Sequence, residues 1–168
     1  MRSRLMGLAL GLVGLTAVAG GCGGGTTINP VPNLLGTWDW DFSGVIGPGA
    51  RQLTYYSDAP KLWAAADISL DQKAWCRMYL GWSVVNPESD TKFTWSYTVN
   101  ADACGEKKGA TGTVKMDMNT TVSPVTMNAV KAGMENLPPL KVVKCGTDPL
   151  VETVCGKSPG LGKPAAPQ

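Results

Sequence analysis

Residues 92–100 have the sequence KFTWSYTVN. Large apolar side chains at Phe93, Trp95, Tyr97 and Val99 alternate with polar side chains throughout this segment. Successive side chains of a β-strand point to opposite faces, so a period of two predicts a strand with one apolar and one polar face. Strands that are buried on one face only are typical of antiparallel sheets.

The same alternation recurs on both sides of this segment. It covers residues 37–42, 76–84 and 113–119, and less regular strand candidates lie at residues 51–56, 62–70, 139–145 and 150–154. Segments rich in Gly, Pro, Asn and Asp separate these runs and predict turns. About eight short strands joined by turns predict a mostly β domain, an antiparallel barrel or sandwich.

One segment departs from the period of two. In residues 125–137, Val130, Met134 and Leu137 follow one another at spacings of four and three. These spacings place side chains on one face of a helix, and the residue before a proline is disfavoured in helical conformation. The pattern predicts one short helix that ends before Pro138.

The start of the first strand carries a motif. The segment Leu35-Gly36-Thr37-Trp38 resembles the Gly-x-Trp motif that opens the first strand of lipocalins and similar barrel-type bacterial proteins. This resemblance implies an eight-stranded cup in which Trp38 closes the base. It also implies a carrier of a small apolar molecule.

The N-terminal residues have the pattern of an export signal. Arg2 and Arg4 precede fifteen apolar residues, 5–19, that end in small side chains. A membrane span needs about 20 such residues. The pattern therefore predicts a signal peptide over residues 1–21 that is cleaved from the chain.

The residues at the predicted cleavage site resemble the bacterial lipobox. They read Val18-Ala19-Gly20-Gly21-Cys22. The resemblance implies that Cys22 is acylated, that membrane lipid is a partner of the chain, and that the chain resides in the bacterial cell envelope. Gly23 is not the aspartate linked to inner-membrane retention, which implies the outer membrane where the host has one. The alternative is an ordinary secretory signal with Cys22 as a free or pairing thiol.

After residue 21, the composition of the chain predicts three successive segments: a tether, a domain and a tail. Residues 22–33 are rich in Gly, Thr and Pro and predict a flexible tether. Residues 34–156 contain all the strand candidates and predict a single β domain. Residues 157–168 are rich in Pro, Gly and Ala and predict a disordered tail.

The cysteines predict disulfide bonds. Assigning Cys22 to lipid leaves an even set, Cys76, Cys104, Cys145 and Cys155, at spacings of 28, 41 and 10 residues. No Cys-x-x-Cys pair and no histidine accompany them, so disulfides are favoured over zinc. Three pairings are possible, and we favour Cys76–Cys104 with Cys145–Cys155 because each links strand candidates separated by little chain.

Composition also narrows the classes of function. The sequence has no histidine, which removes the commonest general base and metal ligand. Its formal net charge of +2 is accounted for by Arg2 and Arg4, and no basic run exceeds Lys107-Lys108. We therefore expect no nucleic-acid partner, no cofactor, no metal site and no enzymatic activity.

Two acidic residues are candidates for chemistry. Asp39 and Asp41 are two apart on a predicted strand, so their carboxylates lie on one face about 7 Å apart. That spacing suits a calcium ion or acid/base work on a sugar. The alternative is a solvated outer face opposite Trp38 and Trp40, which the alternation predicts in any case.

Aromatic residues are candidates for binding a glycan or an apolar ligand. Trp63 and Trp75 are less regularly placed and are expected to be the more exposed tryptophans, and Tyr55 and Tyr56 beside Arg51 could join them. The remaining four lie on apolar faces and are expected in the core or the barrel lining: Trp38, Trp40, Trp82 and Trp95.

Three functions are consistent with these features. The first is a non-enzymatic lipoprotein domain that binds a ligand or partner, or serves the envelope structurally. The second is a lipocalin-like carrier of a small apolar molecule, which a lined cavity would favour and a solid core would exclude. The third is a carboxylate-dependent domain that binds or hydrolyses a glycan.

Overall fold

The computed structural model of the protein describes residues 27–146, 155–157 and 159–166. The predicted signal peptide, Cys22 and the strand candidate at residues 150–154 lie outside the described residues. Everything that follows concerns the part of the chain within these ranges.

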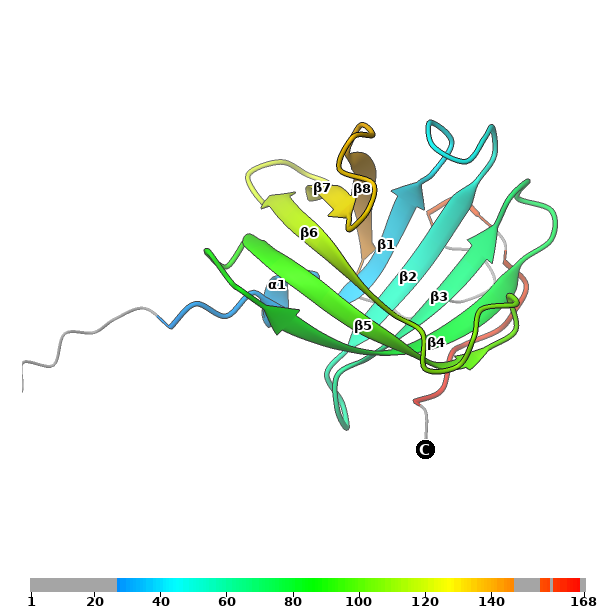
Figure 1. Ribbon diagram of the computed structural model, residues 1–168, viewed down its shortest axis with the longest axis horizontal. Helices are drawn as coiled ribbons and strands as arrows, with labels where there is room; N and C mark the ends of the chain where they lie inside the picture. Colours follow the sequence, from blue (N-terminus) through cyan, green and yellow to red (C-terminus); the bar gives the residue numbers. More distant parts are fainter. Residues whose placement is uncertain (1–26, 147–154, 158, 167–168) are drawn as a thin grey trace, which may run out of the picture.

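Eight antiparallel strands form a closed barrel, and one short helix precedes them (Figure 1). Each strand pairs with the next in sequence, and β8 pairs with β1. The elements are α1 (Val31–Leu34), β1 (Gly36–Asp41), β2 (Arg51–Ser57), β3 (Trp63–Ser69), β4 (Cys76–Val85), β5 (Lys92–Asp102), β6 (Thr111–Asn119), β7 (Thr126–Lys131) and β8 (Leu140–Gly146). The predicted mostly β barrel with one short helix is confirmed.

The position of the helix was predicted wrongly. Residues 126–131 form strand β7, which pairs with β6 on one side and β8 on the other. Its buried residues Met127 and Ala129 are two apart, so the period that governs this segment is that of a strand. The helical spacing of Val130, Met134 and Leu137 does not decide the conformation here, because residues 126–131 form backbone hydrogen bonds to both β6 and β8 as a strand.

Helix α1 instead occupies part of the segment that we predicted to be a flexible tether. Pro32 lies in its first turn, where the missing N–H of proline costs no helical hydrogen bond. Leu34, its last residue, is fully buried. Asn33 donates a side-chain hydrogen bond to the carbonyl oxygen of Asp90, which ties the helix to the β4–β5 loop.

Trp38 connects helix α1 to the base of the barrel. Its ring is fully buried, and its Nε1 donates a hydrogen bond of 2.7 Å to the carbonyl oxygen of Leu34. Lys144 lies with its ammonium 5.3 Å from the ring centroid of Trp38 and donates to the carbonyl oxygen of Asn33. We call this the closed end of the barrel. The loops 58–62, 86–91 and 120–125 lie at the same end.

The inner faces of the strands supply the main core. Its buried members alternate along each strand, as the period of two predicts. At the level of the closed end this core is filled by large side chains, including Trp38, Trp82, Phe93, Met116, Met118, Met127 and Val142.

The C-terminal residues 159–166 form no helix or strand, but they lie along the outside of the barrel (Figure 1). Pro159 and Pro164 are buried there. Arg77 on β4 donates hydrogen bonds to the carbonyl oxygens of Leu161 and Gly162, at 3.3 and 2.8 Å. This part of the chain therefore differs from the disordered tail that we expected for residues 157–168, because the barrel offers donors to its backbone.

The hydrogen bond from Trp38 can be isolated by a matched pair of substitutions. Trp38→Phe and Trp40→Phe make the same change at two buried positions, but only Trp38 Nε1 has a described acceptor. We expect Trp38→Phe to lower the free energy of unfolding by about 1–3 kcal/mol more than Trp40→Phe, because it leaves a buried carbonyl without its donor. Equal losses in urea denaturation would contradict this.

Candidate functional site

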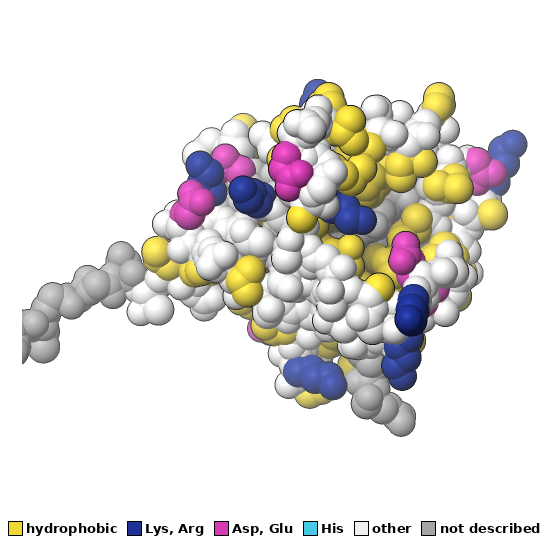
Figure 2. Space-filling model, in the orientation of Figure 1, with side chains coloured by type: hydrophobic (Ala, Val, Ile, Leu, Met, Phe, Trp, Pro, Cys, Tyr) yellow, Lys and Arg dark blue, Asp and Glu magenta, His cyan; other side chains and the backbone are white. Residues whose placement is uncertain are grey.

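A cavity opens at the end of the barrel opposite helix α1. Its volume is about 350 Å³, and its entrance is surrounded by the loops 42–50, 70–75, 103–110 and 132–139. Figure 2 shows this face hollowed, with hydrophobic side chains around the hollow and charged side chains near its edge. The side chains of the lining come mainly from inner-face positions, among them Trp40, Phe42, Gln52, Ile68, Met78, Leu80, Trp95, Tyr97, Val99, Val114 and Leu140.

Aromatic rings make up much of the cavity wall. Trp40 stacks on Phe42 with ring centroids 6.5 Å apart, and Trp95 stacks on Tyr97 at 4.8 Å. The rings of Trp40 and Trp95 lie 6.3 Å apart and join the two pairs. Rings held by one another and by the strands give a large, rigid apolar contact area.

Gly112 makes room for one of these rings. It pairs with Tyr97 across β5 and β6, and a Cβ at position 112 would collide with the ring and hydroxyl of Tyr97. The absence of a side chain on β6 therefore lets the Tyr97 ring lie flat against the neighbouring strand.

Three buried polar groups near the cavity have no hydrogen-bond partner among the described residues. They are Nε1 of Trp40, Nε1 of Trp95 and the hydroxyl of Tyr56. Burial, together with the nearby Tyr97, holds the pKa of Tyr56 well above its usual value, so its hydroxyl stays protonated. A buried donor left without a partner costs about 1–3 kcal/mol.

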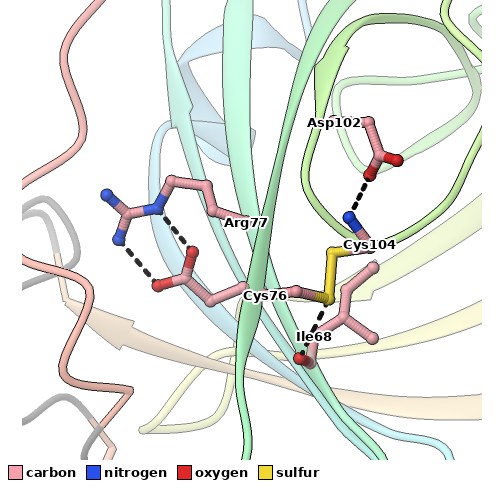
Figure 3. Close-up of a disulfide and its surroundings, with 6 residues drawn as sticks. Ile68, Cys76, Arg77, Asp102 and Cys104 are labelled. Carbon is pink, nitrogen blue, oxygen red and sulfur yellow. Dashed lines mark hydrogen bonds and ion pairs between the residues drawn. A yellow bond between two sulfur atoms is a disulfide. The ribbon is translucent and has the colours of Figure 1, made fainter.

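A disulfide bond braces the entrance. Cys76 begins β4, Cys104 lies in the β5–β6 loop, and their Cα atoms are 5.2 Å apart. Figure 3 shows the bond together with the Asp102 carboxylate, which accepts a hydrogen bond of 2.7 Å from the backbone N–H of Cys104. The predicted pairing of Cys76 with Cys104 is confirmed. The structure also joins Cys145 to Cys155, with Cα atoms 5.4 Å apart.

The edge of the entrance combines charged and apolar side chains. Glu106 and Lys131 contribute to the lining and are exposed. Ile46 and Leu70, at the tips of two loops, expose 58% and 65% of their surface. These two side chains extend the apolar surface of the cavity to the edge of its entrance.

The two predicted acidic residues lie on the outer face of β1, each in its own ion pair. Asp39 is 3.2 Å from Lys157, and Asp41 is 3.0 Å from Arg51. Burial raises the pKa of Asp41, but hydrogen bonds from Ser43 and the charge of Arg51 outweigh it, so the net pKa lies below the usual value. The two carboxylates share one face as predicted, but the structure engages them with different partners.

The two predicted tyrosines are divided between the faces of β2. Tyr56 lies in the main core, where its ring meets the rings of Trp82 and Trp95 edge-on. Tyr55 lies on the outer face and contacts Trp63 edge-on, with ring centroids 5.7 Å apart. Neighbouring positions on a strand point in opposite directions, so the pair cannot act in one site.

The expectation of exposure was wrong for Trp63, which keeps only 4% of its surface exposed. It packs with Leu53 and Ala65 in a second apolar cluster outside the barrel, against which Tyr55 and Trp75 also lie. This cluster arises because β2 and β3 carry apolar residues on both faces. Trp75 is partly buried, and its Nε1 donates to the carbonyl oxygen of Gln72.

Several residues of the cavity were not singled out from the sequence. Gln52, Ile68 and Met78 belong to the lining, and each lies at an inner-face position of its strand. Alternation could have found them as inward-facing residues. It could not have separated those that line the cavity from those that fill the core.

Within residues 27–146, 155–157 and 159–166, no group of three or more Cys, Asp or Glu side chains is placed to hold a metal ion. No helix in these ranges is long and apolar enough to cross a membrane. A comparison with protein-family models, curated proteins and solved structures finds no match for this chain.

The disulfide at the entrance gives a prediction about stability. We expect Cys76→Ser with Cys104→Ser to lower the free energy of unfolding by about 3 kcal/mol, because the unfolded chain regains the freedom that the closed loop removes. Urea denaturation of the double variant and the unchanged chain measures the difference. Recovery of Cys76 and Cys104 as free thiols in the unchanged, non-reduced chain would contradict the prediction.

Proposed function

We propose that this chain is a non-enzymatic binding protein whose barrel holds one small, largely apolar molecule. The observation that carries this proposal is the cavity of about 350 Å³ with its aromatic and aliphatic lining. Eight-stranded barrels are wide enough to hold one small ligand, and apolar pockets at the mouth of a barrel are common binding sites. A core filled from end to end would have argued against a carrier.

The size of the cavity limits the ligand. Small-molecule sites span about 300–1,000 Å³, and this cavity lies near the lower limit. The closed half of the barrel is filled by residues such as Phe93, Met116 and Met127, so a long chain has no room to extend inward. The fitting ligand is a compact molecule, and a ring system would stack on Trp40 or Trp95.

Lipid anchoring of the chain through Cys22 is part of the proposal. It is supported by the signal-peptide pattern of residues 1–21 and by the lipobox-like residues that precede Cys22. The described chain enters the barrel through α1 at the closed end, where Asn29 and Asn33 bond to Asp90. A lipid on Cys22 would therefore hold the barrel by its closed end and leave the cavity entrance facing away from the membrane.

The carboxylate-dependent alternative gains no support from the geometry. Asp39 and Asp41 are held by Lys157 and Arg51 on the outer face of β1, and neither carboxylate belongs to the cavity lining. We therefore do not propose glycan hydrolysis.

Filling the cavity tests the proposed binding function. We expect Val114→Phe to weaken binding of the neutral apolar dye N-phenyl-1-naphthylamine at least about tenfold, or about 1.4 kcal/mol, because the added ring occupies the space that the dye would take. Dye fluorescence titrated against the purified protein measures the affinity.

Val143→Phe is the matched control for this test. It makes the same substitution at an exposed position on the outer face of β8 and should leave dye binding unchanged. Equal affinities of both variants and the unchanged chain would place the dye outside the cavity and reject the proposal. Because extra volume in a core can destabilise it by about 1–3 kcal/mol, circular dichroism must show that both variants are folded.

The proposed lipid attachment at Cys22 has a separate test. We expect Cys22→Ser to abolish incorporation of labelled fatty acid and to release the protein from the membrane fraction, because only the cysteine thiol can form the thioether to lipid. Detergent phase partitioning of the expressed full chain measures the change. Unchanged partitioning of the variant would reject lipid anchoring at this residue.

A further inference from the structure

The lining of the cavity contains a glutamine between apolar neighbours. Gln52 lies at an inner-face position of β2, where it is paired with Trp40 on β1 and with Ile68 on β3. All three residues belong to the lining. An amide group loses hydrogen bonds to water when it is placed in an apolar wall, and this is unfavourable unless a partner replaces the water. A polar group at this position therefore needs a hydrogen-bond partner.

One side of the Gln52 amide has such a partner within the barrel. Its Nε2 donates a hydrogen bond of 2.8 Å to Oγ1 of Thr54. Thr54 is fully buried and lies two positions further along the same face of β2. Because the acceptor is held in the core, this bond fixes the direction of the amide before any ligand enters.

The other side of the amide is open. Among the described residues, no donor bonds to the amide oxygen of Gln52, and this oxygen is not one of the buried unpartnered atoms. The Nε1 atoms of Trp40 and Trp95 differ, because they are buried although both residues line the cavity. The two tryptophans therefore present ring carbon atoms to the cavity, and Gln52 presents a hydrogen-bond acceptor.

The hydroxyl of Tyr97 is a second polar group of the wall. Tyr97 lies on β5, is half-buried, belongs to the lining and stacks on Trp95. A phenol hydroxyl both donates and accepts hydrogen bonds, so it does not select between donors and acceptors on a ligand. A carbonyl oxygen of an amide only accepts. A ligand group that bonds to the open oxygen of Gln52 must therefore be a donor.

The wall favours a ligand without net charge. Glu106 and Lys131 lie at the exposed edge of the cavity and have opposite signs. Arg51 also belongs to the lining, but its guanidinium forms an ion pair with Asp41. A charge that enters an apolar wall without a counter-ion loses hydration that one amide cannot replace.

We propose that the ligand of the cavity is a neutral compound of one or two rings with a hydroxyl group, and that Gln52 selects it by accepting a hydrogen bond from that hydroxyl. This inference rests on the proposed binding function and adds the class of ligand. The rings stack on Trp40 or Trp95, and the hydroxyl lies against β2. A ligand with a methyl group in place of the hydroxyl has the same size but leaves the amide oxygen without a donor, so it binds less well.

Two neutral probes of similar shape test the role of Gln52. The first, 2-naphthol, has the hydroxyl, and the second, 2-methylnaphthalene, has a methyl group in its place. Their dissociation constants are measured by displacement of N-phenyl-1-naphthylamine from the purified protein and from the variants Gln52→Met and Gln72→Met. Methionine is similar to glutamine in length and has no amide. Gln72 is exposed and does not belong to the lining, so it is the matched control.

We expect Gln52→Met to weaken binding of 2-naphthol, relative to 2-methylnaphthalene, by about five- to tenfold, because one hydrogen bond to the ligand is lost. Binding of 2-methylnaphthalene should be kept or strengthened, which also shows that the variant is folded. Gln72→Met should leave the ratio of the two dissociation constants unchanged. Gln52→Leu repeats the measurement if Gln52→Met does not fold.

The outcomes separate this inference from the proposed function. An unchanged ratio in Gln52→Met, with both probes still bound, would overturn the role of Gln52 and leave the binding function standing. Loss of the preference for 2-naphthol in Tyr97→Phe but not in Gln52→Met would assign the hydroxyl to Tyr97 instead. Failure of the dye and of both probes to bind the unchanged protein would reject the binding function and this inference together.

Discussion

The pairing of β1 with β8 is the constraint on which the rest of the structure depends. It leaves none of the eight strands with an unpaired edge and turns one face of every strand inward. Trp38 and Lys144 lie on these two strands, and both bond to helix α1. The same pairing therefore closes the barrel around its circumference and holds the helix at one end.

Closure alone does not decide whether a barrel is solid. Methionine and aromatic side chains fill the half of this barrel near α1, whereas the other half ends in four loops that do not cover it. Cys76–Cys104 braces one of these loops, and the aromatic rings of Trp40, Trp95 and Tyr97 support one another. The result is a cup whose floor is packed and whose upper wall is rigid. That combination suits binding of a compact ligand without rearrangement of the wall.

The outer surface of the barrel also differs from strand to strand. Most strands alternate between buried residues and residues that are partly or fully exposed, but β3 is buried at almost every position because it packs on the core inside and on an apolar cluster outside. The C-terminal segment crosses the outer face beside this cluster. Four residues that the sequence marked as candidates for binding, Asp39, Tyr55, Trp63 and Trp75, come together on this face. Tyr56 lies in the core instead, and Asp41 lies in a separate ion pair with Arg51.

The sequence by itself determined the strand periodicity and a mostly antiparallel β domain, and it favoured the disulfide Cys76–Cys104, because these follow from local alternation, turn residues and short separations along the chain. It left a barrel and a sandwich both open, and only the pairing of β1 with β8 decided for the barrel. Only the tertiary structure decided that residues 126–131 are a strand, since that depends on the neighbours β6 and β8. It also decided which inward residues line a cavity, and where residues 159–166 lie. Both depend on contacts between positions far apart in sequence, such as Arg77 with Gly162, which no local pattern encodes.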